Sequence, residues 1–257
     1  LVTPFILRRN KKEVLTELPD KIEQNIILPF NDEEEKLYVA NLAEANKELQ
    51  ELYDLEGSDK MQILKLLTRL RQLCLEPRLV YDDIDQPSSK LKACMELIKT
   101  MQENKQKVLL FSSFTSVLDL IAEECQKAGI TYYMLTGSTN KEDRRELVSR
   151  FQKDDTTVFL ISLKAGGTGL NLTSAEAVIH FDPWWNVSAQ NQATDRAYRI
   201  GQKNNVQVFN LVMKDSVEEK IIELQKRKKE LADMFVENNS GGLSQMSKED
   251  ILSLFTM

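Results

Sequence analysis

Short apolar runs that alternate with helical segments constrain the fold of this chain more than any other feature of its sequence. Short, buried strands that are joined through helices indicate a parallel sheet with helices on both faces. The sequence therefore predicts an α/β fold. The apolar runs lie at 108–111, 130–135, 158–161, 177–181 and 206–212, and the helical segments include 89–104, 115–128 and 141–152.

Composition is typical of a folded protein and argues against several other classes. The chain has 257 residues, which is enough for one large domain or two small ones. With only 9 Gly and 6 Pro, a β-sandwich rich in tight turns is disfavoured. The formal net charge of −6 argues against a uniformly basic surface, although a local basic face can still bind nucleic acid. No apolar run reaches the length that a membrane span needs.

The cysteines and the single histidine argue against a disulfide framework and against a metal centre. Cys74, Cys94 and Cys125 are odd in number and lack C-x-x-C spacing, and His180 is the only histidine. We interpret the cysteines as small apolar residues of a protein in a reducing compartment. That compartment would be the cytoplasm of a bacterium, at the nucleoid, or the nucleus of a eukaryote.

Changes in pattern along the chain predict three divisions. A short strand at 22–28 precedes a helical section over 31–80, which breaks near 57–59. The acidic linker at 82–89 marks a boundary. The chain starts without Met inside an apolar stretch, so we expect it to be a piece of a longer protein. The divisions are a lead-in with the helical section (1–87), an α/β region (88–215), and a brace helix with a tail (216–257).

Four loops that follow predicted strands carry hydroxyl groups, glycines or other polar groups. In a parallel sheet such loops share the edge at the carboxyl ends of the strands, where ligands bind. Hydroxyls and exposed backbone N–H groups are donors suited to a phosphate chain. A helix cap or a tight turn explains any one loop, but explains all four together less well. The loops are 112–114, 136–139, 162–171 and 182–186.

Two arginines after the last of these loops form a second candidate for phosphate binding. Arg196 and Arg199 are three residues apart, so on a helix they would share a face, with Gln192 one turn earlier. Paired guanidinium groups can clamp a polyphosphate through bidentate contacts. The alternative is a solvated basic face, on which Asp195 pairs locally.

The segment 192–202, Q-x-x-D-R-x-x-R-I-G-Q, resembles motif VI of the Snf2 family within the superfamily 2 helicases. Residues 162–171 resemble motif V of this family, 108–114 resemble motif IV, and 136–139 resemble its L-x-G-S/T element. The segment 182–186 is similar to its D-x-x-W-N-P segment. The resemblance covers nearly the whole chain. It implies the C-terminal lobe of such a motor, with a RecA-like parallel sheet, helices on both faces, and a helical insertion and lead-in.

The resemblance also implies roles in ATP hydrolysis for the matched residues. Arg196 and Arg199 would be arginine fingers that reach the γ-phosphate of ATP, and Gln192 would orient them. Gly169 and Asn171 would approach the ribose. The ATP and its Mg²⁺ would be bound mainly by the N-terminal RecA-like lobe of the same protein.

Double-stranded DNA is the other implied partner, together with a protein bound on that DNA. Trp185 would lie against the tracked strand, with core packing as an equally weighted alternative. The residues that would grip the DNA backbone are Ser112, Ser113, Thr136, Gly137, Ser138, Lys164 and Gly166.

Two positions depart from the family pattern. Val187 replaces the usual proline after Trp-Asn, and Glu76 stands where the family often has His in a Cys-x-His-Pro segment. Both changes leave the shape of the local loop open.

The phosphate-binding motif G-x-x-x-x-G-K-[ST] does not occur in the chain, and no D-E-x-H follows a strand. The chain alone is therefore expected not to hydrolyse ATP. One hypothesis is a motor lobe. The alternative is a non-catalytic DNA- or protein-binding module derived from such a lobe. A DEAD-box-like RNA helicase is disfavoured by Ile200-Gly201-Gln202 and by Trp185-Asn186.

Overall fold

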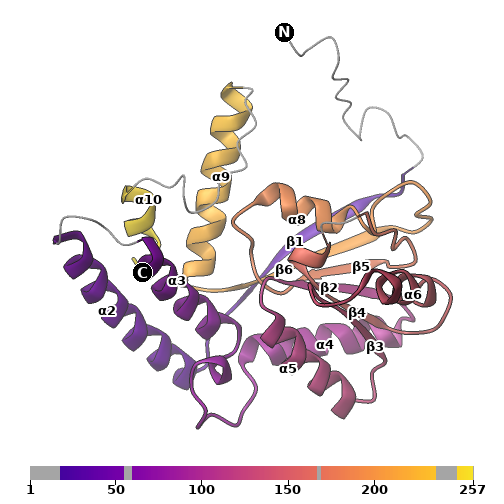
Figure 1. Cartoon of the computed structure of the whole chain (residues 1–257), viewed down its shortest axis with the longest axis horizontal. Helices are drawn as coiled ribbons and strands as arrows, with labels where there is room; N and C mark the ends of the chain where they lie inside the picture. The colour runs from indigo at the N-terminus through magenta and orange to yellow at the C-terminus, as the bar shows by residue number, and fades with distance from the viewer. Residues whose placement is uncertain (1–17, 55–59, 167–168, 236–247, 257) are drawn as a thin grey trace.

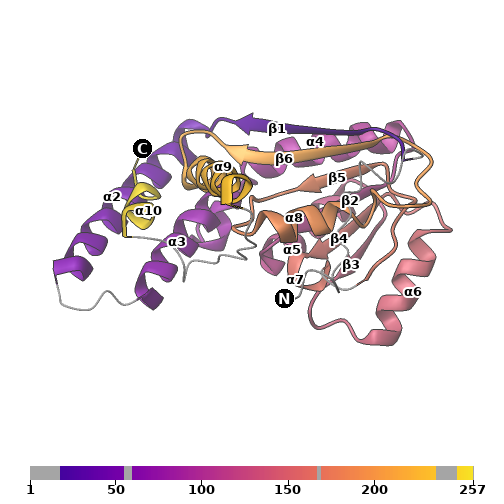
Figure 2. The same ribbon diagram turned by 90° about the horizontal axis from the view of Figure 1, so that it is seen from above.

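The computed structural model describes residues 18–54, 60–166, 169–235 and 248–256. Figures 1 and 2 show a twisted sheet with helices on both sides, next to a group of helices formed by both ends of the chain. The strands are β1 (Lys21–Leu28), β2 (Val108–Ser112), β3 (Tyr132–Leu135), β4 (Val158–Ser162), β5 (Ala177–His180) and β6 (Val206–Met213). The helices are α2 (Asp32–Asp54), α3 (Lys60–Leu75), α4 (Ser89–Glu103), α5 (Thr115–Lys127), α6 (Lys141–Phe151), α7 (Leu163–Gly166), α8 (Val187–Thr194), α9 (Val217–Phe235) and α10 (Lys248–Ser253), with a 3-10 turn, η2 (Pro77–Leu79).

The sheet is parallel throughout, in the order β1-β6-β5-β2-β4-β3. This confirms the predicted α/β fold with a RecA-like parallel sheet. The sheet also contains β1, which pairs with β6 from Lys21↔Val206 to Leu28↔Met213. The strand predicted within the lead-in is thus an edge strand of the main sheet, so the sheet draws on residues on both sides of position 87.

Side chains of the central strands alternate between two cores, as the pleat requires. On one face, Val108 and Leu110 of β2 pack with α4 and α5. On the other face, Leu109 and Phe111 pack with Phe151 of α6 and with residues at the end of α8. All five residues of β2 are buried, and so are all five of β4. Both faces are therefore covered by helices, as the apolar runs predict.

A third core joins the two ends of the chain. Leu67 and Leu70 of α3 pack with residues of α2, α9 and α10, among them Ile221 and Ile251, and with Phe255 after α10. Figures 1 and 2 place these four helices together beside the sheet. The predicted helical section and the predicted brace helix thus share one hydrophobic core.

Helix starts follow the local signals in the sequence. Asn31 accepts hydrogen bonds from the N–H groups of Glu33 and Glu34 at the start of α2, and Glu34 accepts in return from the Asn31 N–H. This is a reciprocal cap of the kind that side chains at helix starts form. Ser88 caps α4 by accepting from the Leu91 N–H at 3.0 Å. The predicted break near 57–59 lies outside the described residues.

The three cysteines are buried and unpaired. Burial raises the pKa of each thiol, that of Cys125 to about 12. A thiol in this state is a poor nucleophile and a poor metal ligand, so these residues act in packing. Among the described residues, no group of three or more His, Cys, Asp or Glu side chains is placed to hold a metal ion. No helix in the same part of the chain is long and apolar enough to cross a membrane.

Candidate functional site

The loops after β5, β2, β4 and β3 form a continuous row along one edge of the sheet. These four strands are neighbours in that order, and their carboxyl ends point the same way. The structure therefore brings together the four loops singled out in the sequence. Most of the predicted site residues lie in this row.

Asp182, in the loop after β5, organises the middle of the row. Its buried carboxylate accepts a hydrogen bond from the Ser112 hydroxyl at 2.7 Å and from the Ser113 N–H at 3.0 Å. The Ser113 hydroxyl also donates to it. Ser112 is fully buried in this contact, which argues against direct contact of its hydroxyl with DNA, and its role in the DNA grip stays a prediction. Ser113 is half-buried and also shares its hydroxyl with this network.

Arg71 completes the network from α3 and was not predicted from the sequence. Its Nη2 donates to Asp182 Oδ2 at 2.8 Å and to Ser113 Oγ at 2.9 Å. The guanidinium lies 4.9 Å from the ring centre of Phe114 and 5.6 Å from that of Trp185. The available signal was its position four residues after Leu67, on the apolar face of α3.

Trp185 is half-buried between the sheet and the helical section. It packs against the core that α2, α3, α9 and α10 share, and it covers the Arg71 guanidinium. Both contacts favour the packing alternative for this residue. A role against a DNA strand stays a prediction.

The loop after β3 presents small polar groups to solvent. Gly137 and Ser138 are exposed, and the Thr136 hydroxyl lies 2.8 Å from that of Ser138. The Thr139 hydroxyl closes the turn by accepting from the Thr136 N–H at 3.1 Å. The loop thus offers neutral donors at the sheet edge.

The loop after β4 begins with the short helix α7, on which the Lys164 side chain is exposed. Gly166 ends α7, and the two residues after it lie outside the described part. Gly169 is exposed with φ +37°, a conformation that other residues adopt with strain. Asn171 is exposed, and its carbonyl accepts from Gln152 Nε2 at 2.7 Å.

Arg196 and Arg199 lie in turns after α8 rather than on one helical face. Helix α8 begins at Val187, directly after Asn186, which caps it by accepting from the Ala189 N–H, and it ends at Thr194. The prediction of a shared helical face is therefore wrong. Gln192 is exposed on α8.

The two arginines are nevertheless close to each other and to the loop after β4. The Arg196 carbonyl accepts from the Leu172 N–H at 3.0 Å, and Arg199 Nη1 lies 3.5 Å from the Leu170 carbonyl oxygen. The pKa of Arg196 is lowered, chiefly by burial and then by the charge of Arg199, while Asp195 opposes the change. Two cationic groups are thus held together against the segment 169–172, as a site for an anion requires.

The two departures from the family pattern have local explanations. Glu76 is buried and accepts from Arg78 Nε at 3.0 Å and from the Ser88 N–H at 3.0 Å. It therefore fixes the turn between the helical section and α4. Val187 is the first residue of α8, where Asn186 supplies the cap.

Sequence profiles of two protein families match the chain. Residues 1–79 match the SNF2-related domain, and residues 89–201 match the helicase conserved C-terminal domain. The chain belongs to the Snf2 family. It is the C-terminal lobe of an Snf2-type ATPase of helicase superfamily 2.

Relatives of this Snf2 lobe occur in bacteria and eukaryotes. An ATP-dependent helicase of Mycoplasma pneumoniae is 39% identical over 254 residues, which cover 98% of this chain and 24% of the relative. The ISWI chromatin-remodeling complex ATPase ISW1 of Saccharomyces cerevisiae is 34% identical over 279 residues, covering 99% of this chain and 24% of the relative. The chain thus spans about a quarter of the length of these relatives.

Solved Snf2 structures have the same architecture. The SWI2/SNF2 ATPase core of Sulfolobus solfataricus in complex with double-stranded DNA gives a TM-score of 0.75 at 32% identity. That comparison covers 98% of this chain and 54% of the other. The C-terminal part of the Fun30 ATPase domain also gives a TM-score of 0.75, at 25% identity, covering 93% of this chain and 98% of the other.

Proposed function

We propose that this chain is the second motor lobe of an ATP-dependent double-stranded DNA translocase. In this role it supplies Arg196 and Arg199 as arginine fingers for ATP hydrolysis, and it supplies part of the grip on the DNA backbone. The first RecA-like lobe would precede it in the full-length protein. A protein bound on the DNA would be what the motor displaces or moves.

The arginine pair carries this proposal. Arg196 and Arg199 are fastened by their contacts to Leu172 and Leu170, and burial, followed by the charge of Arg199, lowers the pKa of Arg196. A module that only binds DNA has no need for a buried guanidinium beside a second one. Such a pair suits the charge that develops on a transferring phosphoryl group, where arginine fingers contribute roughly 10³-fold or more to the rate.

The residues around the pair fit one side of a nucleotide. Gly169 is exposed, and a Cβ built there would meet no atom within 4 Å, so a ligand has room to approach the backbone. Asn171 lies between Leu170 and Leu172, and Gln192 lies four residues before Arg196. Both side chains are exposed, and their amide groups can bind hydroxyl or phosphate oxygens.

The Mg²⁺ ion is assigned to the first lobe. The described residues hold no cluster of acidic or imidazole ligands, and the chain has no G-x-x-x-x-G-K-[ST] motif. ATP with Mg²⁺ supplies the phosphoryl group when bound. This lobe would only stabilise negative charge, so the chain alone is proposed to turn over no ATP.

The DNA grip is assigned to the row of loops at the sheet edge. Thr136, Gly137, Ser138 and Lys164 supply donors and a charge there, and Gly166 closes α7 in the same row. Neutral donors and backbone N–H groups position a phosphate backbone without reading its sequence. The DNA-bound relative from Sulfolobus solfataricus supports double-stranded DNA as the partner.

DNA-stimulated ATP hydrolysis by the full-length protein tests the proposal. We expect Arg196→Ala and Arg199→Ala each to lower kcat by roughly 10³-fold, because transition-state charge loses its partner. Arg150→Ala is the matched control, since this exposed arginine pairs with Glu146 at 2.5 Å on α6, away from the arginine pair. Unchanged kcat in both finger variants would favour the non-catalytic binding module.

A further inference from the structure

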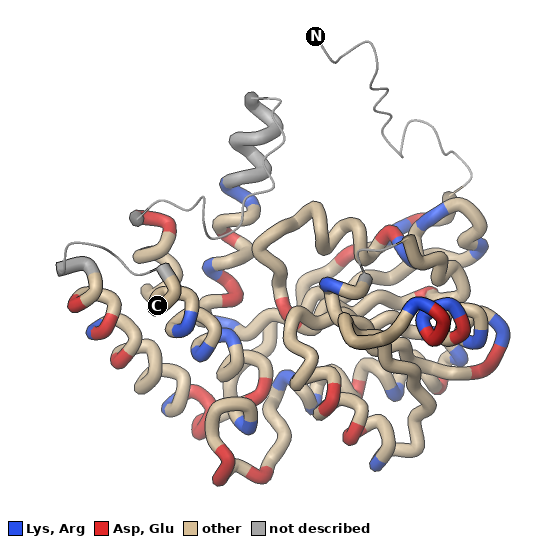
Figure 3. The backbone as a smooth tube through the Cα atoms, in the orientation of Figure 1, with Lys and Arg blue, Asp and Glu red and all other residues tan. Residues whose placement is uncertain are grey.

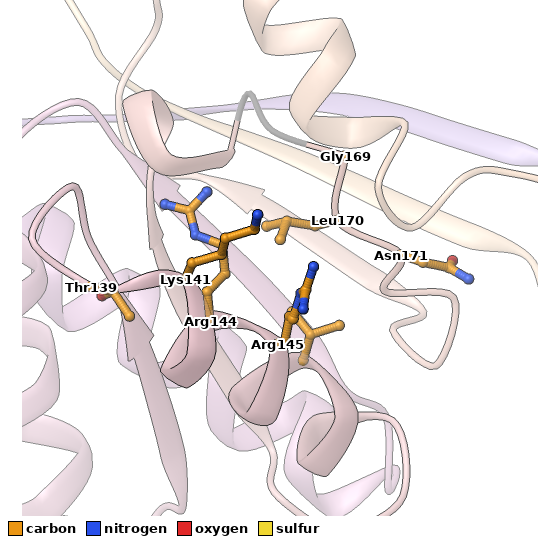
Figure 4. A pocket seen from close by; sticks show the side chains of 8 residues that line it. Thr139, Lys141, Arg144, Arg145, Gly169, Leu170 and Asn171 are labelled. Carbon is orange, nitrogen blue, oxygen red and sulfur yellow. The ribbon is translucent and has the colours of Figure 1, made fainter.

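A cleft of about 700 Å³ lies between α6 and the residues 169–171. Figure 4 shows the Lys141, Arg144 and Arg145 side chains reaching from α6 toward Gly169 and Leu170. The three cationic residues are spaced so that they share one face of the helix. The described residues that line it are Thr139, Lys141, Arg144, Arg145, Val148, Gly169, Leu170 and Asn171.

Two of the cations in this cleft have no partner among the described residues. Lys141 and Arg145 are exposed, and neither side chain makes a hydrogen bond or an ion pair within that part of the chain. Arg144 Nη1 lies 3.4 Å from the Ala165 carbonyl oxygen.

Two of the three acids of α6 have partners outside the cleft, although Figure 3 shows both signs of charge on this helix. Glu146 pairs with Arg150, and Asp143 accepts from Asn140 Nδ2 at 2.8 Å. Glu142 is exposed in the first turn. Among the described residues no acidic side chain lines the cleft, so its positive charge is available for a ligand.

We propose that this α6 cleft binds a backbone phosphate of double-stranded DNA, with Lys141 and Arg145 as its main ligands. The inference rests on the proposed function and adds one step to the DNA grip. Thr139 ends the loop after β3, and Gly169 and Asn171 lie in the loop after β4, so the cleft continues the row of loops. Because β3 is the last strand of the sheet, the cleft forms the far end of that row.

The chemistry of the lining favours a phosphodiester over a nucleotide. The described lining contains no aromatic ring to stack on a base, and its apolar side chains are those of Val148 and Leu170. Exposed lysine and arginine side chains gain most from a polyanion such as DNA, because neutralising its phosphates releases condensed counterions.

The cleft also touches the backbone that supports the arginine pair. Leu170 lines the cleft with its side chain, and its carbonyl oxygen lies 3.5 Å from Arg199 Nη1. A phosphate bound against Gly169 and Leu170 would therefore restrict the segment on which Arg199 rests. In the full-length protein, cleft variants should need more DNA for half-maximal stimulation of ATP hydrolysis.

Binding of a short DNA duplex, measured by fluorescence anisotropy from 50 to 200 mM salt, tests the proposal in this chain and in the full-length protein. The test variant is Lys141→Ala/Arg145→Ala. The matched control is Arg150→Ala/Lys153→Ala, which removes the same charges from the last turn of α6 and the turn after it, outside the cleft. We expect the cleft variant to bind about tenfold more weakly, with a salt slope reduced by about 1 to 2, and the control to bind like the parent.

Each other outcome overturns the inference. Equal losses in both double variants would mean general attraction to the helix, and no loss in either would mean that DNA does not enter the cleft. Loss of ADP binding with unchanged DNA binding would assign the cleft to the nucleotide. If the full-length parent binds no duplex at all, the proposed function fails together with the inference. If the parent binds duplex and only the cleft variant fails to differ from the control, the inference alone fails.

Discussion

The Nη2 atom of Arg71 and the Oδ2 atom of Asp182 lie 2.8 Å apart, in a contact where the Asp182 side chain is fully buried. Arg71 belongs to the helical section, and Asp182 belongs to the loop after β5. The pair therefore fastens the group of helices to the sheet edge that carries the candidate site. Because Asp182 also holds Ser112 and Ser113, one carboxylate sets the positions of two neighbouring loops.

Truncation of Arg71 should destabilise the protein strongly. Arg71→Ala leaves the Asp182 carboxylate buried without its cation, and removing one partner of a buried pair costs about 3–5 kcal/mol. We expect that loss in the free energy of unfolding measured with urea. The control is Arg69→Ala on the same helix, whose exposed side chain lies 3.9 Å from Glu44 and should cost less than about 1 kcal/mol. Similar losses in the two variants would show that the buried ion pair contributes no more to the free energy of unfolding than an exposed one.

A second buried ion pair joins α4 to α9. Lys90 Nζ lies 2.6 Å and 2.7 Å from the two carboxylate oxygens of Glu218, which also accepts from the Met213 N–H at 2.8 Å. Both side chains are almost completely buried. The contact ties the start of α4 to the end of β6 and the start of α9.

Lys90→Met should destabilise the protein by about 3–5 kcal/mol, because Glu218 is left charged or must take up a proton in the core. Lys90→Met/Glu218→Gln should recover most of this loss, since Gln keeps an acceptor for the Met213 N–H. A thermodynamic cycle of the single and double variants by urea unfolding measures the coupling. Additive losses would contradict the prediction, and the exposed Lys92→Ala serves as the neutral control.

The elements of the central sheet could be predicted because each follows from local pattern. The runs at 108–111 and 158–161 lie within β2 and β4, and Gly129, with φ +67°, follows the end of α5 as expected of a helix stop. The partner of β1 could not be predicted, because its pairing with β6 joins residues far apart in sequence. Its exposed side chains also give a weak apolar signal.

The candidate site was predictable as a set of loops and less so as a set of side chains. Spacing alone places Arg196 and Arg199 near each other, but it cannot show that α8 ends at Thr194. Ser112 is the opposite case, since a serine at the end of a strand can face solvent or the interior. The buried Asp182 carboxylate decides its direction, and the sequence does not show that partner.

Glu76 should be a structural requirement at the turn before α4. Its carboxylate accepts from Arg78 Nε and Nη2, at 3.0 Å and 3.1 Å, and from the Ser88 N–H. Glu76→Ala leaves these donors without an acceptor, so we expect a loss of about 3 kcal/mol in the free energy of unfolding. Glu76→Gln should lose less, because one acceptor oxygen remains. Equal losses in the two variants would show that the volume of the side chain matters rather than its hydrogen bonds.

His180 should make the stability of the protein fall in mildly acidic solution. Burial lowers its pKa from 6.5 to about 4, although Glu23 and Asp182 partly oppose the change. Its Nε2 lies 2.9 Å from the Thr194 hydroxyl oxygen, and its ring stacks on Phe111.

The sign of this effect follows from proton binding. Between pH 6.5 and pH 4 the unfolded chain binds a proton at this histidine and the folded protein does not, so stability is complete above pH 6.5 and decreases as the pH falls. We expect a loss of about 2 kcal/mol between pH 7.5 and pH 5, measured by urea unfolding. Because His180 is the only histidine, His180→Gln should remove this dependence while keeping a polar partner for Thr194. An unchanged pH profile in that variant would assign the loss to carboxylates instead.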